Sequence, residues 1–352
     1  MTDSKSLTRQ AGKIVCLCIA WYAFSSANNV LGKQIFNVFP YPMTVCMVQL
    51  LTLNAFLGPA LAVLDVQPAP HFNRRFYLRR MVPLALGKLF ATLSAHLSIL
   101  KVPVSYAHTV KAMLPFFTVL LSVVIMREHY SMKVYLSLVP IISGVLIATA
   151  TELSFDLVGM VAALSATILT ALLNIYSKKC MRDTRIHHLR LLLVLSQLCC
   201  VFLFPVWLYT DVWDIIITLH KVRHLGWLVF ALPVDGVLMF GQNIIAFSMI
   251  SAVTPVSYSV ANATKRIVVI SVSLLLLKNP VTIWNVCGMM TAIAGVALYN
   301  MVKITSMNES PPVLPVTTKD NDPLHLSDMH AGSEAYHIDI DASYRSSPMK
   351  II

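Results

Sequence analysis

The 352-residue chain is 57% hydrophobic and only 12% charged, with a mean hydropathy of +0.72. Soluble domains carry about a quarter charged residues, so this composition excludes a soluble globular protein and predicts an integral membrane protein. The net charge of +11 does not indicate nucleic-acid binding, because most lysines and arginines fall in loops expected on the cytosolic side of a membrane. We therefore expect contact with membrane lipid and no nucleic-acid partner.

Ten apolar runs are each long enough to cross a bilayer as a helix. They cover residues 14–32, 42–64, 81–100, 104–126, 133–151, 155–177, 189–209, 225–248, 256–277 and 280–302. The basic residues between them predict, by the positive-inside rule, that both termini lie in the cytosol. The sequence thus predicts an all-α polytopic membrane protein with ten transmembrane helices.

Both ends of the chain are polar. Residues 1–13 read as a cytosolic N-terminal segment that is too short for a plastid transit peptide, and no small-residue cleavage site follows the first apolar run. Residues 307–352 are rich in Ser, Pro, Asp and His and show no apolar periodicity, which predicts a disordered cytosolic tail. A glycosylation acceptor at Asn308 would then stay unused.

Three short patterns occur once in each half of the chain, in the same order and at offsets of 145 to 152 residues. They are Pro-Val-Ser-Tyr at 103–106 and 255–258, Ile-Ser-Gly-Val at 142–145 against Ile-Ala-Gly-Val at 293–296, and an Asn–Lys pair at 29 and 33 against 174 and 178. They predict two five-helix repeats, at 14–151 and 155–303. Because five is odd, the second repeat enters the membrane from the opposite side, as in many secondary transporters.

Basic residues lie deep in the two helices that carry the Pro-Val-Ser-Tyr pattern. Lys111 lies roughly 12 Å into a hydrocarbon core of roughly 30 Å, and Lys265 and Arg266 approach the same depth from the other face. A cation at the bilayer centre costs at least about 2.5–3.5 kcal/mol. Lysine offers a point charge and arginine a planar fork, a combination suited to phosphate oxygens. We therefore predict an anion site.

Asp235 is the one acidic residue in the middle of an apolar run, and a single carboxylate cannot neutralise three cations. We expect it to pair with one of the basic residues; proton coupling is the alternative. Ser105 and His108 could bind substrate beside Lys111, or could hydrogen-bond to neighbouring helices. Gln242 is a further candidate ligand.

Lys88 is a fourth basic residue in an apolar run. Its side chain could take part in the site or extend to the cytosolic interface. The seven cysteines show no metal-binding or disulfide spacing. No Walker loop, metal cluster or magnesium-binding acidic pair is visible, so the sequence predicts neither an enzyme nor a cofactor or metal.

Several segments carry a resemblance to a known family, among them PVSYAHTVKAMLPFF at 103–117, SYSVANATKRIVVIS at 257–271 and FNVFPYPMTVCMVQL at 36–50. Over roughly 12–303 the chain resembles the triose-phosphate translocator branch of the drug/metabolite transporter superfamily. The segment SKKCMRDTRIHHLRLL at 177–192 is similar to solute carrier family 35, which is closely tied to nucleotide-sugar carriers.

The resemblance implies ten helices, alternating access and exchange of a phosphorylated solute for phosphate or another phosphorylated compound. In the plastid members, a lysine on the fourth helix and a Lys-Arg pair on the ninth hold the phosphate. Those positions match Lys111, Lys265 and Arg266 here.

The same members use a histidine on the third helix and a tyrosine on the eighth for the sugar-like part of the substrate. The histidine position falls on Thr92, or on Lys88 in a second alignment, and the tyrosine position falls on Gln242. Neither residue type is kept, so the resemblance carries over the phosphate site but not the three-carbon specificity.

The sequence therefore predicts a secondary antiporter for a phosphorylated, sugar-phosphate-like solute, in the Golgi or another secretory-pathway membrane rather than a plastid. Two alternatives stay open. One is a nucleotide-sugar transporter of the Golgi or endoplasmic reticulum; the other is a non-transporting membrane adaptor that acts through its C-terminal tail.

Overall fold

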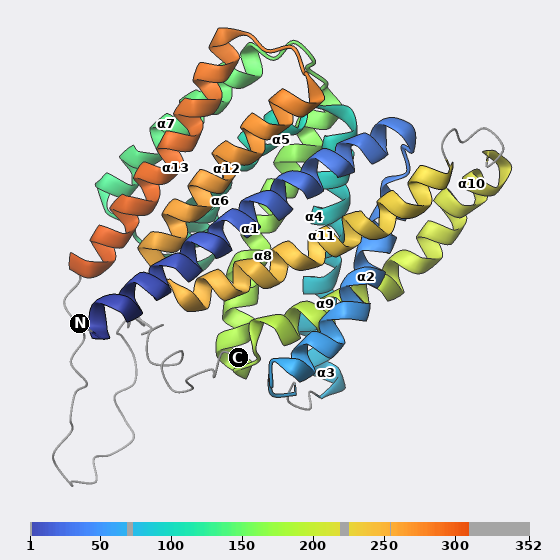
Figure 1. The fold of residues 1–352 in the computed structure, drawn as a ribbon, viewed down its shortest axis with the longest axis horizontal. Coiled ribbons are helices and arrows are strands. Elements are labelled where there is room, and N and C mark those ends of the chain that lie inside the picture. Colours follow the sequence, from blue (N-terminus) through green and yellow to red (C-terminus); the bar gives the residue numbers. More distant parts are fainter. Residues whose placement is uncertain (1, 69–72, 219–224, 254, 310–352) are drawn as a thin grey trace, which may run out of the picture.

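The structure is a computed structural model that describes residues 2–68, 73–218, 225–253 and 255–309, and these residues form helices joined by short turns, with no strand among them. The helices are α1 (Thr2–Val38), α2 (Pro42–Val63), α3 (Arg74–Phe76), α4 (Val82–Lys101), α5 (Val104–Lys111), α6 (Leu114–Leu121), α7 (Met132–Ala150), α8 (Leu157–Thr184), α9 (His188–Trp207), α10 (Trp213–Thr218), α11 (Leu225–Ala252), α12 (Pro255–Leu277) and α13 (Ile283–Glu309), with π-helical segments at Tyr77–Met81, Ser122–Met126 and Leu208–Val212 (Figure 1). Ten helical stretches are long and apolar enough to cross a membrane, which confirms the predicted all-α fold and its ten spans.

The first and last helices extend beyond the predicted spans. Helix α1 begins at Thr2, so the polar residues before the first apolar run are helical too. An apolar run marks the part of a helix that suits lipid, and polar helix-forming residues can continue the helix beyond it. Helix α13 ends at Glu309, and the rest of the predicted tail lies outside the described residues. The start of α1 and the end of α13 lie at the same end of the bundle (Figure 1).

The fourth span is broken, whereas the sequence predicted one continuous helix over 104–126. Pro115 has no N–H to give to the carbonyl of Lys111, four residues earlier. The amides of Ala112 and Met113 bond instead to carbonyls three residues back, both at 3.0 Å. Helix α5 therefore ends at Lys111, and α6 continues the span after a short turn.

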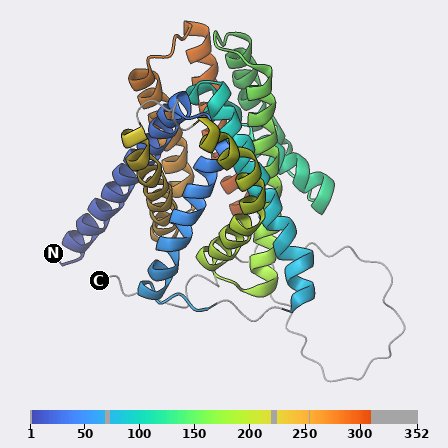
Figure 2. The same cartoon turned by 90° about the vertical axis from the view of Figure 1, so that its right-hand side faces the viewer.

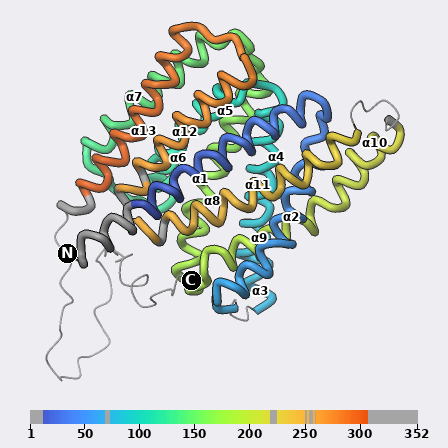
Figure 3. The backbone as a smooth tube through the Cα atoms, in the orientation of Figure 1, coloured from blue at the N-terminus to red at the C-terminus, as the bar shows by residue number. Residues whose placement is uncertain are grey.

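Helices α7 and α13 run alongside each other with their backbones in direct contact (Figure 3). A Cβ atom on Gly144 would lie 2.3 Å from the backbone nitrogen of Ala292, and one on Gly288 would lie 2.6 Å from that of Ala148. Small residues allow such close approach between membrane helices. Gly144 and Gly295, which belong to one of the repeated patterns, both lie in this contact, so it joins the fifth helix of each predicted repeat.

Helix α1 connects the parts of the bundle that hold the candidate residues. It packs against α12 on one side and α11 on the other, and α11 also packs against α2. Helix α5 packs against α8 and α12. In the view turned by 90°, the helices lie close together at one end of the bundle and spread apart towards the other (Figure 2).

Candidate functional site

The packing of α5 against α12 brings three predicted site residues together. Lys111 is the last residue of α5, and Lys265 and Arg266 lie within the unbroken α12. We call these three residues the basic trio. Their side chains are partly buried, and they repel one another electrostatically. Among the described residues, no carboxylate forms an ion pair with any of them.

The basic trio retains binding capacity. One guanidinium nitrogen of Arg266 is buried and has no hydrogen-bond partner among the described residues. The ammonium group of Lys265 lies 4.2 Å from the ring centroid of Trp21, which in turn stacks on Tyr258 at 5.5 Å. A cation–π contact is worth about 2 kcal/mol when desolvated, and the ring brings no negative charge to neutralise the lysine. The trio therefore offers an unneutralised positive site to an anion.

The helix break lies at the trio. Because α5 ends at Lys111, the carbonyls of Thr109 and Val110 accept from the amides of Ala112 and Met113, three residues on, in place of the regular α-helical bonds. In many secondary transporters, binding sites near the bilayer midplane are formed by such discontinuous helices. The broken span thus places the Lys111 side chain at a helix end within a discontinuous membrane span.

Ser105 and His108 also lie on α5, and the structure gives them different surroundings. His108 Nε2 lies 2.8 Å from Asn29 Oδ1 of α1, so it forms the interhelical bond that the sequence left as one alternative. His108 also lies close enough to the trio to feel its charge. The hydroxyl of Ser105 is buried without a hydrogen-bond partner in the described part of the chain.

His96 of α4 is a residue near the trio that the sequence reasoning missed. It is buried, its Nδ1 has no hydrogen-bond partner among the described residues, and its ring lies 5.6 Å from that of Phe36. It is also close enough to Lys111 to feel its charge. The available signal was helical spacing, because His96 follows Thr92 by four residues and so shares a face of the helix with it.

Lys88 and Thr92 do not join the trio. The Thr92 hydroxyl donates to the carbonyl of Lys88 in its own helix at 2.9 Å. The charge of Lys88 interacts with Cys46 and Cys199, two thiols buried between α2, α4 and α9. The ammonium group therefore lies near these two buried thiols rather than in the basic trio.

Asp235 forms no ion pair with a basic residue in the described part of the chain, so the predicted pairing was wrong. Its side chain is only 1% exposed, and it accepts hydrogen bonds from Gln49 Nε2 at 2.6 Å and from Asn28 Nδ2 at 2.9 Å. Gln242 Nε2 in turn donates to Asn28 Oδ1 at 3.3 Å. Helix α11 faces the amide-bearing sides of α1 and α2, whereas the basic trio lies between α5 and α12, so acid and cations occupy different helix contacts.

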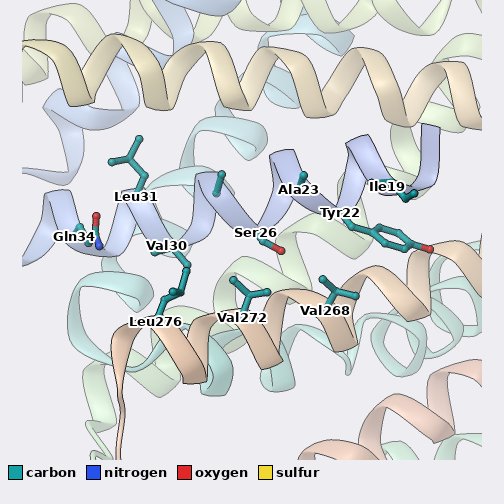
Figure 4. A pocket seen from close by; sticks show the side chains of 11 residues that line it. Ile19, Tyr22, Ala23, Ser26, Val30, Leu31, Gln34, Val268, Val272 and Leu276 are labelled. Carbon is teal, nitrogen blue, oxygen red and sulfur yellow. The ribbon is translucent and has the colours of Figure 1, made fainter. Parts of the chain in front are cut away.

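A surface groove beside α1 is a different feature from the basic trio. It has a volume of about 680 Å³, lies between α1 and α12, and is lined mainly by apolar side chains such as Ile19, Val268 and Leu276 (Figure 4). Ile19 and Leu276 are well exposed, so the groove is open to the surroundings of the bundle. Its lining contains no charged residue, so it offers no ionic partner to an anion.

The chain is similar to known proteins of one transporter family. A model of the Triose-phosphate Transporter family matches residues 12–300. Phosphoenolpyruvate/phosphate translocator 3, chloroplastic, of Oryza sativa subsp. japonica is 33% identical over 304 residues, which cover 85% of this chain and 76% of that protein. A putative transporter of Schizosaccharomyces pombe is 32% identical over 315 residues, which cover 84% of this chain and 67% of that protein.

A relative of lower identity and a solved structure are also similar to this chain. Glucose-6-phosphate/phosphate translocator 1, chloroplastic, of Arabidopsis thaliana is 28% identical over 311 residues, which cover 86% of this chain and 78% of that protein. A solved crystal structure aligns with a TM-score of 0.52 and 12% identity, covering 85% of this chain and 99% of that chain, so it shares the fold alone.

These comparisons test the predicted family, membrane location and nucleotide-sugar alternative. The two plant proteins are named as chloroplastic, so they do not support the expected Golgi location, and none of the three named relatives is a nucleotide-sugar carrier by name. The family model spans nearly all of the membrane region and describes transporters rather than enzymes. The chain is an integral membrane protein and belongs to the triose-phosphate transporter family.

Proposed function

We propose that this protein is a secondary antiporter that exchanges a phosphorylated organic solute for phosphate or another phosphorylated solute. The observation that carries the proposal is the basic trio, which lies within membrane spans without a carboxylate partner among the described residues. Relatives named as translocators of phosphoenolpyruvate, glucose 6-phosphate and phosphate support the same substrate class.

The trio can bind a phosphate group through two kinds of contact. The Arg266 guanidinium offers a planar fork that matches two phosphate oxygens, and the two lysine ammonium groups add point charges. A hydrogen bond between charged groups contributes about 1.5–3 kcal/mol. Because the site is partly buried, these interactions are screened less than they would be in water.

The same electrostatics explain why transport would be an exchange. Without an anion, Lys111 on α5 and the Lys265–Arg266 pair on α12 repel one another, which opposes closure of the helices around the site. A bound phosphate neutralises the trio and permits closure. In this mechanism the two predicted inverted repeats rock about the site, and only the loaded protein changes the side to which the site opens.

The proposal is tested with the purified full chain in liposomes loaded with phosphate. We expect uptake of radiolabelled phosphate by exchange, and its loss in Lys111→Ala, Lys265→Ala and Arg266→Ala. Lys179→Ala, which changes an exposed lysine of α8, serves as the matched control and should exchange normally. Full exchange by all three trio variants would refute the proposed site.

The same assay separates the alternatives. Strong competition by a nucleoside monophosphate, together with weak competition by sugar phosphates, would favour the nucleotide-sugar transporter. Retained cellular function in the triple trio variant, with loss on deletion of 310–352, would favour the adaptor. The predicted location in a secretory-pathway membrane, rather than a plastid membrane, is tested separately by localising the tagged full chain.

A further inference from the structure

Asp235 is a buried carboxyl group for which the proposed phosphate exchange has no use. It lies near the middle of α11, is 1% exposed, and is held by two neutral amides, those of Gln49 and Asn28. An ionised carboxylate in such a place is costly unless it is paired with a cation or surrounded by donors. Asp235 is thus a buried acid with no cationic partner among the described residues.

Of the titratable groups described on the helices packed against α11, none reaches the carboxylate of Asp235. Helix α11 itself carries no other charged residue. From residue 12 onward, the titratable groups of α1, α2 and α12 are Lys13, Cys16, Cys18, Tyr22, Lys33, Cys46, Tyr258, Lys265 and Arg266. None of them forms a hydrogen bond or an ion pair with Asp235. The protonation state of Asp235 is therefore not tied to a fixed countercharge.

The amide partners suit both protonation states of the carboxyl group. As the side chains lie, Gln49 donates to Oδ2 and Asn28 donates to Oδ1, which stabilises the carboxylate. An amide rotated by half a turn presents its oxygen instead and can accept the O–H of a carboxylic acid. A lysine or arginine partner would serve only the ionised form.

Helix α1 links this acid to the basic trio through two consecutive residues. Asn28 bonds to Asp235 and accepts from Gln242, while Asn29 bonds to His108 beside the trio. Movement of α1 against its neighbours therefore disturbs both sites together. A phosphate at the trio also adds negative charge to the membrane interior, which disfavours a second unpaired negative charge at Asp235.

We propose that Asp235 is a proton-binding site, and that the protein takes up a proton there when an anion binds to the basic trio. The proton comes from water and converts the carboxylate to the carboxylic acid; it returns to water when the anion leaves. This inference rests on the proposed anion transport and adds the proton as a second ligand. By linkage, protonation and anion binding strengthen each other by the same factor.

The test is the pH dependence of phosphate exchange by the full chain in liposomes, with equal pH on both sides, compared with Asp235→Asn. The asparagine mimics the neutral acid. Between pH 6 and pH 8 the half-saturating phosphate concentration of the wild type should rise by about 5- to 150-fold more than that of the variant, the range of typical coupling factors. The two proteins should converge at low pH. Ionisation of phosphate, His96 and His108 affects both proteins equally and is removed by the comparison.

Two further variants keep the test independent of folding defects in Asp235→Asn. Gln49→Leu removes one donor to the carboxylate, favours the acid, and should shift the loss of phosphate affinity to higher pH. Asp211→Asn is the matched control: this acid is also buried, but it bonds to the backbone and hydroxyl of Thr44 at the start of α2, so the pH profile should not change.

The outcomes are distinct. Absence of exchange by the wild type at every pH, with phosphate and with sugar phosphates alike, would refute the proposed function. Exchange by the wild type with the same pH dependence in Asp235→Asn, or no shift in Gln49→Leu, would refute only the proton site. Exchange that is lower in Asp235→Asn by a constant factor at all pH values would indicate a structural role and would also overturn the inference.

Discussion

The two halves of the chain use their repeated residues in different ways. In the first half, the Lys33 ammonium donates to three backbone carbonyls at and beyond the end of α4, at 2.7–3.3 Å, and Asn29 bonds to His108. Their counterparts in the second half, Asn174 and Lys178, are exposed and form no hydrogen bond with the described residues. The Asn–Lys pair of the first half therefore connects neighbouring helices, whereas the pair of the second half does not.

The basic helices differ in the same way. The Pro-Val-Ser-Tyr pattern lies at the start of both, where Pro103 precedes the first residue of α5 and Pro255 is the first residue of α12. Helix α5 nevertheless stops at Lys111, while α12 continues past Lys265 and Arg266 to Leu277. The break gives Lys111 a helix end, whereas Lys265 lies over Trp21. A shared pattern therefore preserves the position of positive charge in the bundle, while the backbone and the partners of that charge diverge.

The largest effect is expected from exchanging the two kinds of cation. Arg266→Lys keeps the charge but loses the planar fork, so the half-saturating phosphate concentration should rise about 10- to 100-fold, the equivalent of about 1.5–3 kcal/mol. Lys111→Arg keeps a charge at the helix end and should change the half-saturating phosphate concentration much less. Exchange kinetics in liposomes measure both, and equal effects would show that the two helices bind phosphate alike.

The Asn–Lys pairs predict a difference in stability. Lys33→Met removes hydrogen bonds from a charged donor to three carbonyls and should lower the free energy of unfolding by about 1.5–3 kcal/mol. Lys178→Met changes an exposed side chain and should stay within about 0.5 kcal/mol of the wild type. Thermal unfolding in detergent compares the two, and equal shifts would contradict the asymmetry between the halves.

The break in α5 can be repaired by mutation. Pro115→Ala returns an N–H group to the carbonyl of Lys111 and permits one continuous helix, as in the second half. We expect exchange to slow by about tenfold, roughly 1.4 kcal/mol, without loss of thermal stability. Pro205→Ala in α9, a proline inside an unbroken helix, is the control and should exchange at the wild-type rate. Unchanged exchange in Pro115→Ala would show that the break serves no purpose.

The aromatic partner of Lys265 is expected to have the smallest effect. Trp21→Leu removes a contact worth about 0.5–2 kcal/mol and should change the half-saturating phosphate concentration a few-fold. Trp21→Phe keeps an aromatic face and should recover most of the wild-type value. Identical behaviour of the two variants would mean that the ring acts by its bulk alone.

The ten spans and the basic trio were predictable because both depend on composition along the chain: long apolar runs suit lipid, and cations inside them are conspicuous. The helix break after Lys111 was not predictable in the same way, although Pro115 is visible in the sequence. Prolines also lie inside α2, α7, α9 and α11 without ending them, so a proline alone does not predict a break.

The error over Asp235 has a different cause. The sequence shows that one acid and three cations lie in apolar runs, but not which helix faces meet. Asp235 faces Asn28 and Gln49, two amides that composition gives no reason to single out. His96 was missed for a similar reason, since only the packing of α4 brings it near Lys111.

The close contact of α7 and α13 limits where the molecule can bend. At Gly144 and Gly288 the backbones of the two helices touch directly, with no side chain between them. Sliding or rotation of one helix against the other would therefore cause backbone clashes. The two helices form a rigid pair that joins the two halves of the chain. Any movement that opens the protein first to one side and then to the other therefore has to occur in the surrounding helices, of which α1, α5 and α12 lie nearest the basic trio.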